Sequence, residues 1–397
     1  MNIILFDPLS RVNLLPICFT RPVAEIRIGI LTIKEKWERA FPGTYSWFTQ
    51  DYLSKKYPAK ITDDNIFIAG NILPSLMLSA EIASLEVNEA LFCDDKLIAF
   101  RGDLPEFLNL RFNEKKQSES VIISIDHIWD IFGKNDIAIE SDYKAITENR
   151  ESEPISETVN IIGERLFPDG TPKLFIEKGV TMEFVTINLK NGPVYIGKDV
   201  EIQEGSAIRA PFAACEHAVV NMNTKIYGAT TLGPYCKVGG ELNNVVMTGY
   251  SNKAHEGFLG NAVIGEWCNL GAGTNMSNLK NDYSEIKLWS YKDYRFIRTG
   301  LQFCGLIMGD HSKAGINTMF NTATMVGVGC NIFGAGFPRT FIASFSEGGN
   351  AGFNEVILSK FYQSAQRMMS RRNIELTDID KEILDNIYHQ TVDIRNN

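Results

Sequence analysis

An aliphatic residue recurs at every sixth position over much of the C-terminal half of the chain. The first series runs without a gap through Ile196, Ile202, Ile208, Ala214, Val220, Ile226, Leu232 and Val238. The phase then slips by two residues, and a second series runs through Val246, Asn252, Phe258, Ile264, Leu270 and Met276. A third series follows an insertion and runs through Met308, Ala314, Phe320, Val326 and Ile332. An α-helix has a period of about 3.6 residues, so this pattern predicts a different regular structure.

Glycine follows many of these aliphatic residues, as in Ile196-Gly197 and Leu270-Gly271. A parallel β-solenoid accounts for both features, because each short strand turns one aliphatic side chain inward and each corner needs a residue that tolerates positive φ. The alternative is a glycine-rich sandwich with accidental spacing. We predict a solenoid over about residues 160–350. A polar and aromatic excursion between Leu279 and Gly305 interrupts it and is typical of binding or of a subunit contact.

The pattern differs on either side of the solenoid. Residues 1–150 have a mixed α/β pattern, with strands expected at 3–6, 65–69 and 121–125, a helix at 31–40 and a hairpin at 90–100. A polar run at 144–158 suits a linker. After Gly352 two helical patterns follow, the second opening with the cap-like Thr377-x-x-Asp380. We therefore expect an α/β domain over 1–150, the solenoid over 151–352 and a helical cap over 353–397.

Composition narrows the function classes. The 397 residues carry 39 Lys and Arg against 48 Asp and Glu, for a net charge of −9 without a basic block, which disfavours a nucleic-acid partner. No apolar run is long enough for a membrane span and the N-terminus lacks the pattern of a signal peptide, so we expect no membrane partner and a cytoplasmic location. The seven scattered cysteines suit small buried hydrophobes better than a disulfide framework or a structural zinc site.

Candidate chemistry gathers where polar residues interrupt the repeat. Lys253 and His255 stand in the second series, and Asn269 to Gly273 follow about one coil later. Residues about 18 apart occupy the same corner of adjacent coils, so we expect His255 to lie beside this second stretch. A histidine titrates near neutrality and suits removal of a proton from a nucleophile. Lysines such as Lys280 and Lys287 suit binding of a phosphate.

These residues carry a specific resemblance. His255, Gly260, Ile264-Gly265 and Asn269-Leu270-Gly271-Ala272-Gly273-Thr274 resemble the acetyltransferase half of the bifunctional N-acetylglucosamine-1-phosphate uridylyltransferase and glucosamine-1-phosphate N-acetyltransferase family, here called GlmU-like. The likeness covers about residues 195–345. It implies a left-handed parallel β-helix built of hexapeptide repeats, assembly as a homotrimer, and acetyl-CoA as cosubstrate.

The resemblance also implies roles for individual residues. His255 becomes the general base, and the substrate-binding residues are Lys253, Phe258, Asn269, Asn278, Lys280 and Lys287. The acetyl-CoA surface includes Ala272, Gly273, Gly315, Ala335 and Arg339. Two positions depart from the family pattern, because Phe258 stands where the family has a tyrosine and Asn261 where it has an aspartate. Loss of a hydroxyl contact relaxes the choice of sugar, which leaves the acceptor sugar phosphate open.

The N-terminal domain partly resembles a Rossmann-like sugar nucleotidyltransferase. Asp7-Pro8-Leu9-Ser10 replaces the glycine-rich loop, and proline has no amide for a triphosphate. Arg11, Thr20 and Arg21 are candidates for binding UTP or dTTP, with Arg27 as a further cation. Asn71 follows a strand where the family holds Mg²⁺ with an aspartate, so Mg²⁺ stays open for this domain. The alternative is a structural role in which the arginines pair with Asp7 and Glu25.

Three functional hypotheses follow. The leading one is an acetyl-CoA-dependent N-acetyltransferase acting on glucosamine 1-phosphate or a related amino-sugar phosphate, fused to a divergent nucleotidyltransferase domain, in nucleotide-sugar biosynthesis. The second is a sugar-1-phosphate uridylyl- or thymidylyltransferase whose β-helix serves assembly or regulation. The third is a non-catalytic trimeric scaffold that binds a sugar nucleotide. A zinc site of His217, His255 and His311 is disfavoured, because two coils separate the first two by roughly 10 Å along the axis.

Overall fold

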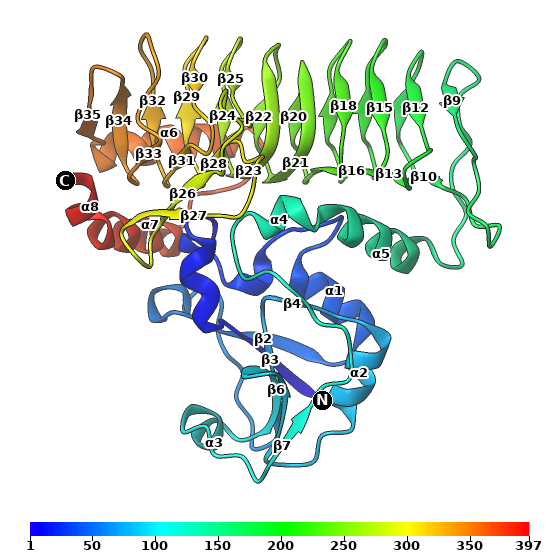
Figure 1. Cartoon of the computed structure of the whole chain (residues 1–397), viewed down its shortest axis with the longest axis vertical. Helices are drawn as coiled ribbons and strands as arrows, with labels where there is room; N and C mark the ends of the chain where they lie inside the picture. The colour runs from blue at the N-terminus through cyan, green and yellow to red at the C-terminus, as the bar shows by residue number, and fades with distance from the viewer. Residues whose placement is uncertain (397) are drawn as a thin grey trace. The chain divides into compact units, whose positions relative to one another are not determined.

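The computed structural model describes residues 1–396 and falls into two compact units. Unit 1 consists of Met1–Ile26 and Leu31–Ile128, and unit 2 consists of Arg27–Ile30 together with the chain from Trp129 onward. The predicted fold class is confirmed, since unit 1 is α/β and unit 2 is a parallel β-helix followed by helices (Figure 1). The predicted limits of three domains stay a prediction.

Unit 1 contains a mixed six-stranded sheet. Its strand order is β2 (Thr44–Phe48), β1 (Asn2–Phe6), β3 (Asn65–Ala69), β6 (Lys96–Gly102), β5 (Glu89–Cys93) and β7 (Glu114–Gln117). Strands β2, β1 and β3 are parallel, and β6 is antiparallel to β3. The predicted hairpin is β5 and β6, which turn at Asp94 with a positive φ of 52°. The predicted strand at 121–125 is reduced to β8 (Ile123–Ser124), paired with β4 (Ile72–Leu73).

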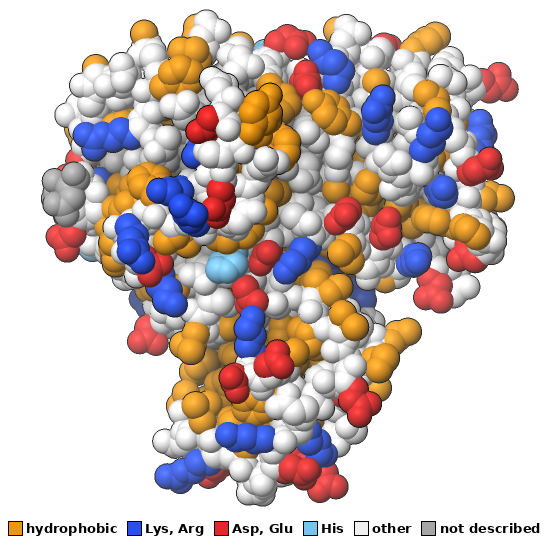
Figure 2. Space-filling view, viewed as in Figure 1, with side chains coloured by type: hydrophobic (Ala, Val, Ile, Leu, Met, Phe, Trp, Pro, Cys, Tyr) orange, Lys and Arg blue, Asp and Glu red, His pale blue; other side chains and the backbone are white. Residues whose placement is uncertain are grey.

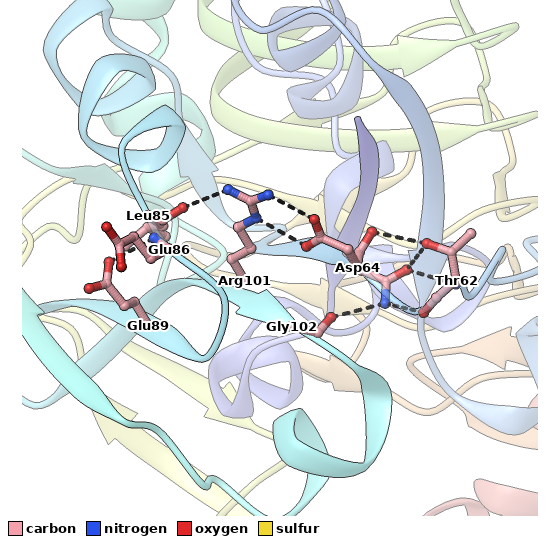
Figure 3. Close-up of polar contacts among 8 residues, drawn as sticks. Thr62, Asp64, Leu85, Glu86, Glu89, Arg101 and Gly102 are labelled. Carbon is pink, nitrogen blue, oxygen red and sulfur yellow. Dashed lines mark hydrogen bonds and ion pairs between the residues drawn. The ribbon is translucent and has the colours of Figure 1, made fainter.

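The helices of unit 1 are short. They are α1 (Ile33–Ala40), which begins with a capping box between Thr32 and Glu35, α2 (Leu76–Ala83) and α3 (Leu104–Leu108). Figure 3 shows how side chains fasten the edges of β3 and β6. Arg101 donates two hydrogen bonds to Asp64, of 3.0 and 2.8 Å, and a third of 2.9 Å to the Leu85 carbonyl. This contact is structural, and none of the candidate residues takes part in it.

The β-helix of unit 2 has three faces, and its strands lie side by side along one axis (Figure 1). Face A contains β10 (Leu174–Ile176), β13 (Val194–Ile196), β16 (Phe212–Ala214), β19 (Thr230–Leu232), the second halves of β21 (Glu241–Gly249) and β23 (Phe258–Glu266), β28 (Ile307–Met308), β31 (Met325–Val326) and β33 (Phe341–Ile342).

Face B contains β11 (Thr181–Met182), β14 (Glu201–Ile202), β17 (Val219–Val220), β20 (Lys237–Val238), β22 (Asn252–Lys253), β24 (Asn269–Leu270), β29 (Lys313–Ala314), β32 (Asn331–Ile332), β34 (Ser346–Gly349) and the antiparallel β35 (Gly352–Glu355). Face C contains β9 (Asn160–Ile162), β12 (Thr186–Asn188), β15 (Ala207–Arg209), β18 (Lys225–Tyr227), the first halves of β21 and β23, β25 (Asn275–Met276) and β30 (Met319–Phe320). The predicted excursion is the hairpin of β26 (Lys287–Ser290) and β27 (Arg295–Arg298).

The first and third hexapeptide series are confirmed, since all their residues are buried. The second series is wrong at its first three positions. Met247, Lys253 and Leu259 are fully buried there, whereas Asn252 and Phe258 are only half-buried. The repeat shortens at two kinds of corner. The corner between faces B and C at Gly239-Gly240 loses two residues, since Val238 pairs 18 residues after Val220 whereas Leu242 pairs only 16 after Ile226. Strands β21 and β23 each lose one more between face C and face A, so the coils from Val238 to Lys253 and from Lys253 to Leu270 contain 15 and 17 residues. Val246 is also buried, but on the outer side of β21, where α4 (Asp130–Gly133) covers the strand.

A ladder of rings runs along the corner between faces A and B. It consists of His217, Tyr235, Tyr250, Trp267 and His311, with neighbouring ring centroids 4.4 to 6.4 Å apart and planes within 27° of parallel. Each of these residues has a positive φ of 53° to 60°. The next corner residue is Gly329, and Phe361 from α6 (Leu358–Ser370) packs there between His311 and Phe345.

Other segments of unit 2 cover or close the β-helix. Helix α5 (Asn135–Thr147) packs on β19, where Asn135 donates a 3.0 Å hydrogen bond to the Ala229 carbonyl. The Gly29 amide in turn donates to Asn135 at 2.7 Å. At the C-terminal end lie α7 (Asp378–Gln390), which has the predicted Thr377/Asp380 capping box, and α8 (Val392–Asn396). Arg395 fastens this end through bonds of 3.0 and 2.7 Å to Glu355.

Candidate active site

The corner between faces B and C brings several predicted residues together. His255 and Ala272 occupy it on adjacent coils, and Asn252 pairs in register with Asn269 just before it. The Gly273 amide donates a 3.0 Å hydrogen bond to the Glu256 carbonyl, which joins the two coils. Gly315 occupies the same corner on the next coil. The two coils are so close that a Cβ on Gly271 would lie 2.6 Å from the Gly315 carbonyl carbon. The expected proximity of His255 to residues 269–273 is confirmed.

The His255 imidazole is free to act on a bound molecule. Its side chain is exposed, and within residues 1–396 the imidazole makes no hydrogen bond. The backbone around it is held firmly, because the Ala254 carbonyl accepts a 2.6 Å bond from Asn221 and the His255 carbonyl accepts one of 2.7 Å from Lys253. A fixed backbone beneath an unengaged imidazole suits a general base.

Phe258 and Asn278 lie next to one another on face C. The Phe258 amide donates a 2.8 Å bond to Asn275, and the ring lies over Gly260. A Cβ at Gly260 would lie 2.5 Å from that ring and 2.8 Å from the Asn278 amide nitrogen. Asn278 also donates a 2.8 Å bond to the Asn261 side chain. The amide at Asn261, where the family has an aspartate, thus serves a contact between coils.

The two predicted phosphate-binding lysines have different surroundings. Lys280 bonds within its own loop, to the Ser284 hydroxyl at 3.2 Å and to the Glu285 carbonyl at 3.1 Å. Lys287 is exposed on β26, where it pairs in register with Arg298. Of the two, Lys287 is the ammonium without an intramolecular bond among the described residues.

The last predicted acetyl-CoA residues lie in a loop that replaces a strand of face C. Ala335 and Arg339 are both exposed in this loop, which follows β32. Gly334 and Gly336 flank Ala335 with positive φ values of 105° and 87°, a conformation that glycine adopts without strain. Because Ala314 pairs with Ile332, the loop begins at the same corner as Gly315, one coil further on.

Lys253 does not face a substrate, which corrects its predicted role. Its side chain is 1% exposed and points into the β-helix, at a position where neighbouring coils carry Val238 and Leu270. Its ammonium donates to the carbonyls of Gly239 at 2.9 Å and His255 at 2.7 Å. Burial lowers the pKa of Lys253 to about 8.

In unit 1 the predicted nucleotide-binding cations are engaged within the protein. Arg11 lies 3.1 Å from the Asp7 carboxylate and donates to the Tyr52 hydroxyl at 3.0 Å. Arg21 is only 5% exposed and lies 3.5 Å from the Thr20 hydroxyl. The alternative in which these arginines serve the fold therefore has direct support for Arg11.

Arg27 is likewise engaged, but within unit 2. Its guanidinium donates to the Thr248 carbonyl at 3.2 Å and also to the Ile30 carbonyl. These bonds hold the Arg27–Ile30 segment against the β-helix. Arg27 is therefore engaged by the fold of unit 2, whereas Arg11, Thr20 and Arg21 belong to unit 1, and its role among the nucleotide-binding cations stays a prediction.

The residues around Asn71 do not fit a Mg²⁺ ion. Asn71 donates a 2.9 Å bond to Asp126, a carboxylate that the sequence motif did not single out. The other oxygen of Asp126 accepts from the Lys96 ammonium at 2.7 Å and from the Ser124 hydroxyl at 2.8 Å. Mg²⁺ prefers free carboxylate oxygens, and here a lysine already supplies the positive charge. Across residues 1–396, no group of three or more His, Cys, Asp or Glu side chains is placed to hold a metal.

Histidine and cysteine chemistry elsewhere has little support. His217 and His311 belong to the ring ladder, with three other rings between them, whereas His255 occupies a different corner. All seven cysteines are free, and six of them are buried. Burial raises the pKa of the Cys236 and Cys330 thiols, to about 12 and about 11. A thiolate nucleophile is disfavoured at these positions.

Comparison with known proteins finds relatives of parts of the chain. Residues 3–151 match the family model for sugar nucleotidyl transferase. A bifunctional sugar-1-phosphate nucleotidylyltransferase/acetyltransferase of Sulfurisphaera tokodaii is 30% identical over 145 residues, which cover 36% of this chain and 35% of that protein. The bifunctional protein GlmU of Wolbachia pipientis is 29% identical over 166 residues, covering 36% and 38%. The GlmU-like resemblance is confirmed at this modest identity.

The matches are partial in length. The chain spans little more than a third of the curated relatives it matches. The Arabidopsis UDP-N-acetylglucosamine acyltransferase structure aligns with 61% of this chain and 93% of its own at 12% identity, and its TM-score of 0.21 does not establish a shared fold. Within the described residues, no helix combines the length and apolar composition needed to cross a membrane.

Figure 2 shows the distribution of charged side chains on one face of the molecule. On the face of the described residues in Figure 2, Lys and Arg side chains are interspersed with Asp and Glu, without a broad patch of either sign.

Proposed function

We propose that unit 2 transfers the acetyl group of acetyl-CoA to the amine of glucosamine 1-phosphate or a related amino-sugar phosphate. The observation that carries the proposal is the exposed His255 imidazole on a fixed corner beside Asn269, Ala272 and Gly273. Asn269 contacts the amino sugar and Lys280 or Lys287 its phosphate. Acetyl-CoA lies along Ala272, Gly273, Gly315, Ala335 and Arg339.

The mechanism needs no covalent enzyme intermediate. The amine nitrogen attacks the thioester carbonyl carbon while His255 accepts a proton from that nitrogen. The carbonyl becomes an oxyanion, which a backbone amide of the corner or an asparagine side chain stabilises. Collapse of the tetrahedral intermediate re-forms the carbonyl and breaks the C–S bond, and the departing CoA sulfur takes the proton that His255 accepted, which leaves the amide and free CoA thiol.

Unit 1 is proposed to bind a nucleotide. The family match over residues 3–151 supports a sugar nucleotidyltransferase ancestry. The substrate proposed for such an activity is UTP or dTTP together with a sugar 1-phosphate. The engaged arginines and the Asn71–Lys96 surroundings of Asp126 favour acetyl transfer as the leading activity of the chain. Nucleotidyl transfer, with the β-helix serving assembly, is the second candidate. The protein is proposed to act as a homotrimer in the cytoplasm.

The proposal is tested by thiol release from acetyl-CoA with a panel of amino-sugar 1-phosphates. We expect release that depends on glucosamine 1-phosphate or a close analogue. His255→Ala should lower kcat by about 10²- to 10⁴-fold, the usual contribution of a general base. The matched control is His217→Ala, which removes a ring of the ladder on a different corner.

Each outcome separates the candidates. A folded His255→Ala protein with full thiol release excludes His255 as the base. No release with any acceptor, together with pyrophosphate production from UTP or dTTP and a sugar 1-phosphate, supports the second candidate. Binding of a sugar nucleotide without either reaction supports the scaffold.

A further inference from the structure

Among the described residues of face B, one inward position carries a charged side chain. Elsewhere the inward residues of face B are aliphatic or small, as at Ile202, Val220, Val238 and Leu270. Lys253 occupies the corresponding position on β22, with 1% of its surface exposed. A buried ammonium costs free energy unless it is well bonded, and an aliphatic side chain would avoid that cost. A lysine at this position therefore needs a reason other than stability.

The ammonium bonds to backbone atoms of one corner. It donates to the Gly239 carbonyl, where the preceding coil reaches this corner, and to the His255 carbonyl in its own coil. The Gly239 amide returns a 2.7 Å bond to the Lys253 carbonyl. Two hydrogen bonds therefore tie the coil that carries His255 to the coil before it, and a third holds the His255 carbonyl within its own coil.

The next coil fastens the other side of the same corner. The Gly273 amide donates to the Glu256 carbonyl at 3.0 Å. Gly257 has a φ of 127° and lies so close to the next coil that a Cβ there would be 2.0 Å from the Thr274 carbonyl oxygen. The backbone beneath the exposed imidazole is thus held from both neighbouring coils, and Lys253 supplies the only charged group among these contacts in the described chain.

We propose that Lys253 is a positioning residue, which fixes the His255 corner from inside the β-helix so that the imidazole meets the reacting amine. This inference rests on the proposed acetyl transfer. A charge-assisted hydrogen bond to a carbonyl is stronger than a neutral one, so a lysine can hold a corner that an aliphatic side chain cannot. A displacement of about 1 Å at a reacting group lowers rates by about 10²-fold.

The test uses Lys253→Met in the full chain, because methionine keeps the length and removes the ammonium. Leu270→Met is the matched control, since it places the same side chain inside face B one coil away. We expect Lys253→Met to lower kcat by about 10- to 100-fold while KM for acetyl-CoA changes less than about twofold. The melting temperature should stay the same or rise, which a purely structural lysine would not allow.

A second readout is independent of activity. Hydrogen exchange of the Gly239 and Gly273 amides, which bond to corner carbonyls, should become at least about tenfold faster in Lys253→Met. Exchange at Gly197 and Gly309, whose amides bond between other coils, should not change. If the wild-type protein releases no thiol, the proposed function fails, and exchange alone still decides whether Lys253 holds the corner.

The results that overturn the proposal are specific. Wild-type kcat in Lys253→Met shows that the corner does not need the ammonium, and unchanged exchange at Gly239 and Gly273 shows that Lys253 does not hold it. If the methionine protein does not fold, Lys253→Gln takes its place, because its amide keeps two donors. That variant should fold and lose kcat by an intermediate factor, and wild-type kcat in it overturns the role of the charge.

Discussion

Lys253 has a consequence for stability that is separate from its role in positioning. The pKa of its amine is 10.5 in the ordinary case and about 8 in the folded protein, chiefly because of burial. Between these values the unfolded chain binds more protons, so the free energy of unfolding rises with pH. The nearby charges oppose one another, since Glu256 raises this pKa and Lys225 lowers it.

Lys253→Met should therefore stabilise the protein most at neutral pH. The pKa difference corresponds to an upper limit of about 3 kcal/mol in the free energy of unfolding. We expect the variant to melt above the wild type at pH 7 and this gain to shrink by pH 10. Melting curves of both proteins across that range check the prediction, and a gain that does not vary with pH contradicts it.

The sequence could place His255 beside Asn269 but could not show which way Lys253 points. The hexapeptide pattern assigns positions along a strand, and neighbouring residues of a strand face opposite sides. An error of one position therefore exchanges inward and outward side chains. Asn252 is polar and Lys253 is charged, so the residue type of neither one predicts an inward side chain. The partners of Arg11 and Asp126 were also beyond the sequence, because they depend on contacts between distant segments.

At the scale of elements, the sequence predicts the periodic strands and a slip in the period after Val238, but it places the inward residues after the slip one position too early. The first and third series follow strands joined by regular corners, so a period of six locates an inward residue on each of these strands. Strands β21 and β23 turn from face C to face A at Asn244 and Asn261, which have positive φ, and each takes one residue fewer than the regular coils. The corner at Gly239-Gly240 is two residues shorter than its counterpart on the preceding coil, so the period is lost there. Val246 added to the error, because α4 covers it from outside and it therefore looks like a core residue.

The packing of α6 against the β-helix depends on a glycine, which leaves space at the corner. Gly329 leaves a gap in the corner series, and Phe361 fills it, with its ring centroid 5.8 Å from His311 and 5.3 Å from Phe345. Phe361→Ala should lower the free energy of unfolding by about 3 kcal/mol, since it opens a cavity between two aromatic rings. Urea unfolding followed by circular dichroism checks this value.

A control separates the cavity from a general effect of losing a phenylalanine. Phe184 is 67% exposed in the same unit, so Phe184→Ala should change the free energy of unfolding by less than about 0.5 kcal/mol. Equal losses in the two variants would show that Phe361 does not act as a wedge.

At the scale of the whole molecule, the units do not follow the order of the chain. Residues Arg27–Ile30 belong with the β-helix although unit 1 contains the sequence on both sides of them. Helices α4 and α5 also belong to unit 2, although a boundary near residue 150 would assign them to the N-terminal domain. A linker signal in the sequence reports polar composition, whereas a unit is defined by packing.

This arrangement predicts a difference between two fragments. A fragment of residues 151–397 lacks α4 and α5 and exposes the outer sides of β19, β21 and β23, including Val246. A fragment of residues 129–397 retains these helices and the bond from Asn135 to the Ala229 carbonyl. We expect the longer fragment to melt at a higher temperature, as measured by circular dichroism. Equal melting temperatures would contradict the assignment of α4 and α5 to unit 2.

The shortened coils also affect how the corner that carries His255 could be grafted onto another β-helix. His255 lies 15 residues after Gly240 and 17 before Ala272, its counterparts on the adjoining coils. An engineer who aligned two β-helices by a strict 18-residue repeat would join mismatched ends here. Because one residue of offset turns a side chain from solvent to the interior, the graft would bury the base and expose the lysine. Splice points should therefore be chosen by hydrogen-bonded strand partners.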